Sequence, residues 1–164
     1  DGKMLYKVIR EGNYTNPPKP FGLFMRHCNT LPLSSQTATM KKLLKATKTL
    51  LGRGETILIY PEQSMWWNYR KPRPPVSGAY KFAVANNVPV IPMFITMEDT
   101  DKIGGDGFPI QAYTVHIGEC LKADENLTAK ENINMLMEKN YQFCVDTYER
   151  VYNTKLKFNI KEEK

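Results

Sequence analysis

Residues 56–96, TILIYPEQSMWWNYRKPRPPVSGAYKFAVANNVPVIPMFIT, decide the fold of this chain. An apolar run, Ile57–Tyr60, stops at Pro61, and a short helical pattern separates it from a second apolar run that begins at Val88. A strand, a loop, a helix and a strand in this order predict a βαβ unit of a parallel sheet. Ligands of such sheets bind just beyond the carboxyl ends of the strands, which is where Glu62 falls. We therefore expect an α/β domain with a mostly parallel central sheet flanked by helices.

The chain of 164 residues is long enough to bury the core of one domain. Its 41% hydrophobic and 24% charged residues are typical of a globular protein and not of a disordered one. We predict a single domain over residues 1–154 and a mixed-charge tail over residues 155–164. No apolar run approaches the roughly 20 residues that a membrane-spanning helix needs. Because the chain begins with Asp1 and not with Met, we expect a fragment, a processed chain or an incomplete one.

The net charge of the chain indicates which classes of partner it can bind, and the spacing of its cysteines indicates the compartment in which it resides. A net charge of +6 suits an anionic partner, whether a phosphate group, a membrane surface or a nucleic acid. The three cysteines, Cys28, Cys120 and Cys144, are far apart and form no C-x-x-C motif. This spacing argues against a disulfide framework and against a zinc site, and it favours a reducing compartment. We expect no bound metal.

The remaining elements follow from hydrophobic periodicity. Met4, Leu5, Val8 and Ile9 have helical spacing, and Pro32 within an apolar run indicates an edge or an end of a strand. The expected elements are a helix over residues 4–10, a helix or a strand over 21–25, a strand over 30–33, a helix over 34–51, a loop over 100–109, a strand over 110–117 and a helix over 128–152.

The loop after the first apolar run is rich in aromatic and basic residues. It contains Trp66, Trp67 and Tyr69 beside Arg70, Lys71 and Arg73. Amphipathic rings next to cations fit the headgroup region of a bilayer, and they also fit base stacking along a single-stranded nucleic acid. A simpler interpretation is that one tryptophan covers the core. Glu62 has two interpretations as well: its carboxylate either accepts a hydrogen bond from a substrate hydroxyl or orders the neighbouring backbone.

Three blocks of the chain together resemble a known family. They are YPEQS at residues 60–64, SGAYKFA at 77–83 and VPVIPM at 88–93. The order and spacing of these blocks are similar to those of the glycerophospholipid acyltransferases, typified by 1-acylglycerol-3-phosphate acyltransferase, in which F-P-E-G-T-R-S precedes a Gly-Ala helix and V-P-[IV]-[IV]-P-[VI]. The resemblance covers roughly residues 21–117. It implies a transferase of phospholipid biosynthesis that moves an acyl group from acyl-CoA or acyl-carrier protein, as co-substrate and without a cofactor, to a hydroxyl of a glycerolipid acceptor.

The resemblance also implies the site residues. The substrate-binding residues it indicates are Pro61, Glu62, Gln63, Ser64, Arg70, Lys71 and Arg73. The residues expected to contact the membrane or the acyl chain are Trp66, Trp67 and Tyr69. Met65 occupies the position of the family's arginine, which is expected to hold the acceptor's phosphate, so one of the three basic residues after it is expected to take over that role.

The family's catalytic block, H-x-x-x-x-D, is missing from this chain. The fifth residue after His27 is Pro32 and the fifth after His116 is Leu121, so neither histidine has the aspartate that orients the imidazole in the family. The family places this block before the region that resembles residues 21–35. The resemblance therefore implies a His–Asp pair upstream of Asp1 and an inactive fragment in the present chain.

Two rival interpretations remain from the sequence. The changes at Gln63 and Met65 also fit a catalytically degenerate member of the family that binds lipid or phosphate. A nucleic-acid-binding module fits the pI of 9.2 and the aromatic loop, but leaves the Pro-Glu and V-P-V-I-P blocks unexplained, so a nucleic-acid partner ranks last. The expected partners are an acyl thioester, a glycerolipid acceptor and a membrane surface, and the expected location is the cytoplasmic face of a membrane.

Overall fold

The computed structural model describes residues 2–15, 20–64 and 66–158. Within them the elements are β1 (Leu5–Arg10), α1 (Gly12–Thr15), α2 (Phe21–His27), β2 (Thr30–Leu33), α3 (Thr37–Gly52), β3 (Thr56–Leu58), α4 (Gly78–Ala85), β4 (Met93–Ile103), β5 (Pro109–Ile117) and α5 (Ala129–Tyr152).

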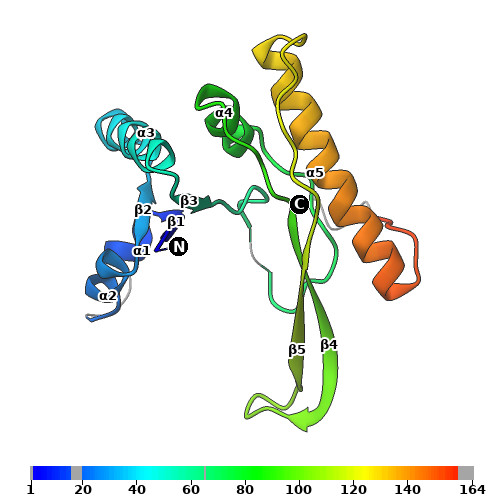
Figure 1. Ribbon diagram of the computed structural model, residues 1–164. Helices are drawn as coiled ribbons and strands as arrows, with labels where there is room; N and C mark the ends of the chain where they lie inside the picture. The colour runs from blue at the N-terminus through cyan, green and yellow to red at the C-terminus, as the bar shows by residue number, and fades with distance from the viewer. Residues whose placement is uncertain (1, 16–19, 65, 159–164) are drawn as a thin grey trace.

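The first part of the chain forms a parallel three-stranded sheet of order β2-β1-β3. The first crossover runs from β1 to β2 through α1 and α2, and the second runs in the opposite direction, from β2 past β1 to β3, through α3. Right-handed crossovers that run in opposite directions place their helices on opposite faces of a sheet, and Figure 1 shows α3 on one side of these strands and α1 and α2 on the other. Val8, Leu31 and Leu43 form the buried centre between the sheet and α3. This mixed α/β arrangement confirms the predicted fold class, and β2, with its Pro32, is an edge strand as predicted.

The second part of the chain is an antiparallel hairpin of β4 and β5 with α5 packed on one face (Figure 1). Phe94 of β4 is buried against Cys144 and Tyr148 of α5. The helix begins at a capping box, in which the Thr128 hydroxyl accepts from the Glu131 N–H and the Glu131 carboxylate accepts from the Thr128 N–H. The long terminal helix that periodicity predicts is therefore present, and its first turn is secured by its own side chains.

The predicted helix over residues 4–10 is wrong, because Leu5–Arg10 is the central strand β1. Its apolar residues fit either a helix or a strand by spacing alone. In the structure β1 pairs with β2 on one side and β3 on the other, and Tyr6 and Val8 pack toward α3. Backbone pairing on both edges outweighs the weak helical pattern of so short a segment.

The second strand of the predicted βαβ unit also differs from the prediction, because it lies in another sheet. β4 begins at Met93 and pairs with β5, and it shares no sheet with β3. Pro89 and Pro92 lack the N–H that a ladder needs, and Val90 between them makes only an isolated bridge to Leu121. The strand continues to Ile103, so the loop expected over 100–109 is shorter than predicted. The division into a domain over 1–154 and a tail remains a prediction, and residues 159–164 of that tail lie outside the described residues.

Candidate functional site

The segment from Pro61 to Val76 leaves β3 and returns to its own starting point. The Val76 N–H donates to the Pro61 carbonyl at 2.9 Å, which closes the neck of the loop. Gln63 has a left-handed backbone, with φ of 56°, and its carbonyl accepts from Arg10 Nη2 at 3.2 Å at the end of β1. A closed loop of this kind, an Ω-loop, is a frequent carrier of function, and here it stands at the carboxyl ends of the parallel strands.

Glu62 is the half-buried acid at the start of this loop. Its carboxylate accepts a hydrogen bond from the backbone N–H of Arg73. Burial raises the pKa of Glu62 above its ordinary value of 4.5, while that hydrogen bond and the charge of the Arg73 guanidinium oppose the rise. The carboxyl group is thus held by the far end of its own loop in surroundings that disfavour its charge.

Helices α4 and α5 supply weak acids around Glu62. Tyr80 of α4 is 1% exposed, and its hydroxyl accepts from Asn140 Nδ2 of α5 at 2.9 Å. Burial raises the pKa of Tyr80 and raises the pKa of the Cys144 thiol to about 12, and the negative charge of Glu62 adds to both shifts. Both groups therefore stay neutral at physiological pH, and Cys144 is an inert thiol and no nucleophile.

The raised pKa of Glu62 predicts a pH-dependent cost to folding. Above its folded pKa the buried carboxylate is charged and destabilises the native state, and this cost disappears as the pH falls below about 4.5, where the group is protonated in both states. Glu62→Gln is therefore expected to raise the free energy of unfolding at pH 7–8 and to leave it nearly unchanged at pH 4. Urea denaturation at both pH values measures this difference. An equal effect at the two pH values would contradict it.

Arg73 joins the acid to the aromatic part of the loop. Its guanidinium carbon lies 4.1 Å from the centre of the Trp66 ring, a cation–π contact. Trp66 in turn meets Tyr69 edge to face, with ring centres 5.0 Å apart. Arg73 Nη1 is buried, and no hydrogen-bond partner for it lies among the described residues. A buried guanidinium nitrogen without a partner is costly, and an anion is the group that best relieves that cost.

Arg70 has a different environment, because it ties the loop to the hairpin. Its Nη2 donates to Asp99 Oδ1 of β4 at 2.6 Å and to Gln111 Oε1 of β5 at 3.2 Å. Gln111 Nε2 also donates to Asp99 Oδ1, and this hydrogen bond and then the Arg70 charge lower the pKa of Asp99. The guanidinium also lies 6.0 Å from the centre of the Tyr152 ring of α5. Arg70 thus fixes the position of the loop.

The other predicted site residues lie around the same loop. Pro61 and Lys71 are half-buried, Gln63 and Ser64 are exposed, and Tyr69 is half-buried and in edge-to-face contact with Trp66. Trp66 is 43% exposed and Trp67 is 78% exposed, so neither tryptophan is buried in the core. Met65, which occupies the family's arginine position, lies outside the described residues. The structure brings Glu62, Trp66 and Arg73 together.

Three residues of the site escaped the sequence analysis. Tyr80, Asn140 and Cys144 come from two helices that are far apart in the chain. Tyr80 belongs to a block that supports the resemblance, but no spacing pattern marks its hydroxyl as a neighbour of Glu62. Asn140 and Cys144 have helical core spacing, which gives no signal beyond burial.

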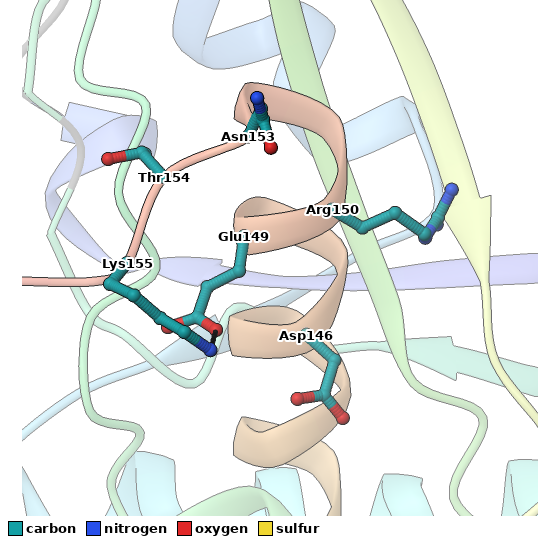
Figure 2. Close-up of a pocket in the computed structure, with 6 residues that line it drawn as sticks. All are labelled: Asp146, Glu149, Arg150, Asn153, Thr154 and Lys155. Atoms are coloured by element: carbon teal, nitrogen blue, oxygen red, sulfur yellow. Dashed lines mark hydrogen bonds and ion pairs between the residues drawn. The ribbon is translucent and has the colours of Figure 1, made fainter.

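A separate hollow of the surface lies away from this loop. It has a volume of about 450 Å³ and lies at the end of α5. Its lining residues are Asp146, Glu149, Arg150, Asn153, Thr154 and Lys155. Figure 2 shows Lys155 paired with Glu149, at 2.6 Å, while Arg150 extends to the other side of the helix. All the lining residues come from one helix end, and none is a nucleophile with an adjacent base, so this hollow offers no catalytic arrangement.

Neither a metal site nor a membrane-spanning helix occurs in the part of the chain that the structure describes. Among residues 2–15, 20–64 and 66–158, no three His, Cys, Asp or Glu side chains gather where they could hold a metal ion. None of the helices described over the same ranges combines the length and the apolar character needed to cross a bilayer.

Comparison with known proteins places the chain in a family. The model of the family described as Acyltransferase matches residues 6–96, more than half of the chain. No curated protein sequence matches. Among solved structures, the 1-acyl-sn-glycerophosphate (LPA) acyltransferase PlsC from Thermotoga maritima is similar, with a TM-score of 0.59 and 19% sequence identity. The match covers 95% of this chain and 59% of the PlsC chain, so the present chain spans less than two thirds of the length of that structure.

The chain belongs to the acyltransferase family. The family match confirms the resemblance to the glycerophospholipid acyltransferases that the three sequence blocks indicate, and the similarity to PlsC confirms the fold. The matched residues 6–96 include β1 from Tyr6 onward, β3 and the whole Pro61–Val76 loop, so the family match and the candidate site fall on the same part of the molecule.

Proposed function

We propose that the full-length protein transfers an acyl group from acyl-CoA or acyl-carrier protein to a hydroxyl of a lysophosphatidate-like glycerolipid. The observation that carries this proposal is the half-buried Glu62, held by the Arg73 N–H at the carboxyl end of a strand that the acyltransferase family matches. PlsC is a 1-acyl-sn-glycerophosphate acyltransferase, and its similarity to this chain supports the same class of acceptor.

The reaction needs a base that the described site lacks. The acceptor oxygen attacks the thioester carbonyl, the C–S bond breaks, and the thiol leaves with a proton that originates from the acceptor hydroxyl. A histidine of an H-x-x-x-x-D block encoded upstream of Asp1 is our proposed base, and its aspartate orients the imidazole. The 164-residue chain alone is therefore expected to be inactive.

Within this chain the acceptor is proposed to bind at the Pro61–Val76 loop. Glu62 accepts a hydrogen bond from an acceptor hydroxyl, and Pro61, Gln63, Ser64 and Lys71 shape the approach. Of the basic residues of the loop, Arg73 is the best candidate for the acceptor's phosphate, because its Nη1 has no hydrogen-bond partner among the described residues. Arg70 already pairs with Asp99 and Gln111, so we assign it to positioning the loop.

The same loop is proposed to contact the membrane in which the acceptor lies. Trp67 is the most exposed of its three rings and Trp66 is partly exposed, while Tyr69 supports Trp66 from the side. Amphipathic rings beside basic side chains suit the headgroup region of a bilayer. We place the protein on the cytoplasmic face, where acyl thioesters are available, and we expect it to need no cofactor.

Glu62→Gln tests this proposal in the protein expressed with every codon upstream of Asp1. With a lysophosphatidate acceptor and an acyl-CoA donor, we expect kcat/KM to fall by about 10- to 100-fold, the loss of one charged hydrogen-bond acceptor in the transition state. Glu119→Gln, which changes an exposed glutamate in the same way, is the matched control and should retain full activity. Unchanged kinetics in Glu62→Gln would refute the assigned role.

The second candidate is a degenerate member of the family that binds lipid or phosphate without chemistry. The absence of an Asp five residues after either histidine favours it. An upstream sequence without H-x-x-x-x-D, together with lysophosphatidate binding that Arg73→Gln weakens, would favour this candidate over the enzyme.

A further inference from the structure

One segment of the chain carries its whole excess of positive charge. Residues 12–54 contain 7 of the 23 basic residues and none of the 17 acidic ones. The remainder of the chain has 16 basic and 17 acidic residues, so its net charge is only −1. A charge of one sign that is concentrated in one part of a protein attracts a partner of the opposite sign.

Helix α3 holds most of this charge on its outer face. Its four lysines are all exposed, and the helix has no acidic residue. Lys41, Lys45 and Lys48 have the i, i+4, i+7 spacing that places side chains on one face of a helix. Lys42 lies three residues before Lys45 and borders the same face. Together these four residues form what we call the lysine face.

Nothing in the described part of the chain compensates the lysine face. None of its four ammonium groups has a hydrogen-bond or ion-pair partner among residues 2–15, 20–64 and 66–158. Like charges at these helical spacings repel and weaken the helix. The other long helix, α5, instead mixes three basic with four acidic side chains, as a solvated helix surface usually does. The lysine face is therefore unusual for a surface that contacts only water.

The helix is not free to lie in a bilayer. A membrane-surface helix buries its own apolar face among the lipids, but the apolar face of α3 is already used in the protein core. Leu43 is 2% exposed, and Met40 and Leu50 pack against the same core. A partner of α3 must therefore recognise its outer face as it stands.

The outer face combines charge with a small apolar area. Leu44 is 49% exposed beside the lysines. A shallow hollow of about 370 Å³ adjoins them, and its lining residues are Lys42, Lys45, Ala46, Thr49 and Leu50. Apolar groups among charges of one sign are typical of a surface that docks a folded protein of the opposite charge.

The position of α3 relates this face to the candidate site. The helix starts at Thr37, just after β2, and so begins at the carboxyl ends of the parallel strands, where the Glu62 loop also stands. With a rise of about 1.5 Å per residue, Lys41 lies about 6 Å and Lys48 about 16 Å along the helix from Thr37. A protein docked on the lysine face would thus lie next to the edge at which the acyl group must arrive.

We propose that the lysine face of α3 docks an acyl-carrier protein, the acidic protein that carries an acyl thioester on a flexible phosphopantetheine arm. This inference rests on the proposed function and selects one of the two donors named there. The lysines pair with acidic side chains of the carrier, while the arm extends past the carboxyl ends of the strands to the acceptor at Glu62. Coenzyme A, the other donor, is a small molecule that needs a concave pocket, and the convex face of a single helix provides none.

A charge-reversal variant tests the docking in the protein expressed with every codon upstream of Asp1. The probe is palmitoyl-acyl-carrier protein from the same organism, and its Kd is measured by biolayer interferometry. We expect Lys41→Glu/Lys45→Glu to raise the Kd about 10-fold or more at low salt, and added salt to reduce the difference from the parent. Both positions are exposed, and circular dichroism verifies that the variant is folded.

Lys122→Glu/Lys130→Glu is the matched control. Both of its lysines are exposed and lie outside α3, and each double variant lowers the net charge by four, from +6 to +2. The control should change the Kd by less than about twofold, because the attraction depends on the local cluster of charge and not on the total. Equal losses in the two double variants would overturn the docking site.

Kinetics with the two donors add a second readout. We expect Lys41→Glu/Lys45→Glu to raise KM for palmitoyl-acyl-carrier protein about 10-fold, with kcat unchanged, and to leave KM for palmitoyl-CoA as in the parent. A structural fault in α3 would impair both donors alike. Equal changes with the two donors would therefore refute the docking role.

Two further outcomes separate this inference from its rivals and from the proposed function. Loss of binding to vesicles of anionic phospholipid in Lys41→Glu/Lys45→Glu, with carrier binding unchanged, would overturn the docking in favour of a membrane surface. Carrier binding that the variant abolishes, in a parent that transfers no acyl group, supports the docking and refutes the function. Acyl transfer from the carrier with the same KM in both double variants does the reverse.

Discussion

Leu43→Ala is expected to lower the free energy of unfolding by about 2–5 kcal/mol, the usual cost of emptying a leucine site in a packed core. Leu43 is 2% exposed and lies at the centre of the core between α3 and the parallel sheet, against Val8 and Leu31. Strands β1 and β2 are fixed by their pairing, so the core has little freedom to collapse into the space left behind. The loss should therefore fall in the upper part of this range.

The neighbouring Leu44 provides the matched control. It is on the same helix and 49% exposed, and it is not part of the core between α3 and the sheet. Because alanine is a good helix former, Leu44→Ala should change the unfolding free energy by less than about 0.5 kcal/mol. Urea denaturation followed by circular dichroism compares the two variants. A loss in Leu43→Ala no larger than in Leu44→Ala would show that the core is not packed as described.

The parts of the fold that could be predicted are those where a strong local pattern agrees with the tertiary environment. Residues 128–152 have a long apolar stripe and a Thr-x-x-Glu start, and α5 follows them. Residues 4–10 have only a weak pattern, and their strand conformation depends on partners at residues 30–33 and 56–58. No window of the sequence contains those partners, so β1 could not be predicted from its own residues.

Some residues of the candidate site could likewise be predicted from the sequence, and others could not. Glu62 could be located because a strand followed by Pro61 predicts where a parallel sheet ends. The separate roles of Arg70 and Arg73 could not, because both are basic residues of one polar loop. Arg70 meets Asp99 and Gln111 only when the loop packs against the hairpin. Arg73 meets the ring of Trp66 only when the loop itself is folded.

Glu62 shows why such a site has a cost in stability. Its carboxylate is half-buried beside Tyr80 and Cys144, two groups that stay neutral and so provide no opposite charge. Arg73 gives partial compensation through its N–H and its charge. A variant that is more stable at pH 7 and less active, as expected of Glu62→Gln, is the usual sign that an acid is retained for chemistry and not for folding.

Gly22→Ala is expected to destabilise the protein by about 1–3 kcal/mol, the usual cost of overpacking. A Cβ at this buried position of α2 would lie 3.0 Å from the Tyr14 carbonyl carbon and closer still to its oxygen. Backbone atoms cannot rotate away as a flexible side chain would. Tyr14 is also anchored, since its hydroxyl shares a 2.6 Å hydrogen bond with Thr30 Oγ1 on β2. Relief of the clash therefore requires α1 and α2 to move apart. Such a movement would also strain the Tyr14–Thr30 hydrogen bond to the edge strand β2.

Gly52→Ala is the opposite case in the same chain. Gly52 ends α3, and a Cβ there would meet no atom within 4 Å. Alanine at this place should stabilise the protein by up to about 1 kcal/mol, because it restricts the unfolded chain without a clash. Thermal denaturation of the two variants should thus move Tm in opposite directions. A Gly22→Ala protein at least as stable as the parent would mean that α1 and α2 do not pack as closely as the structure has them.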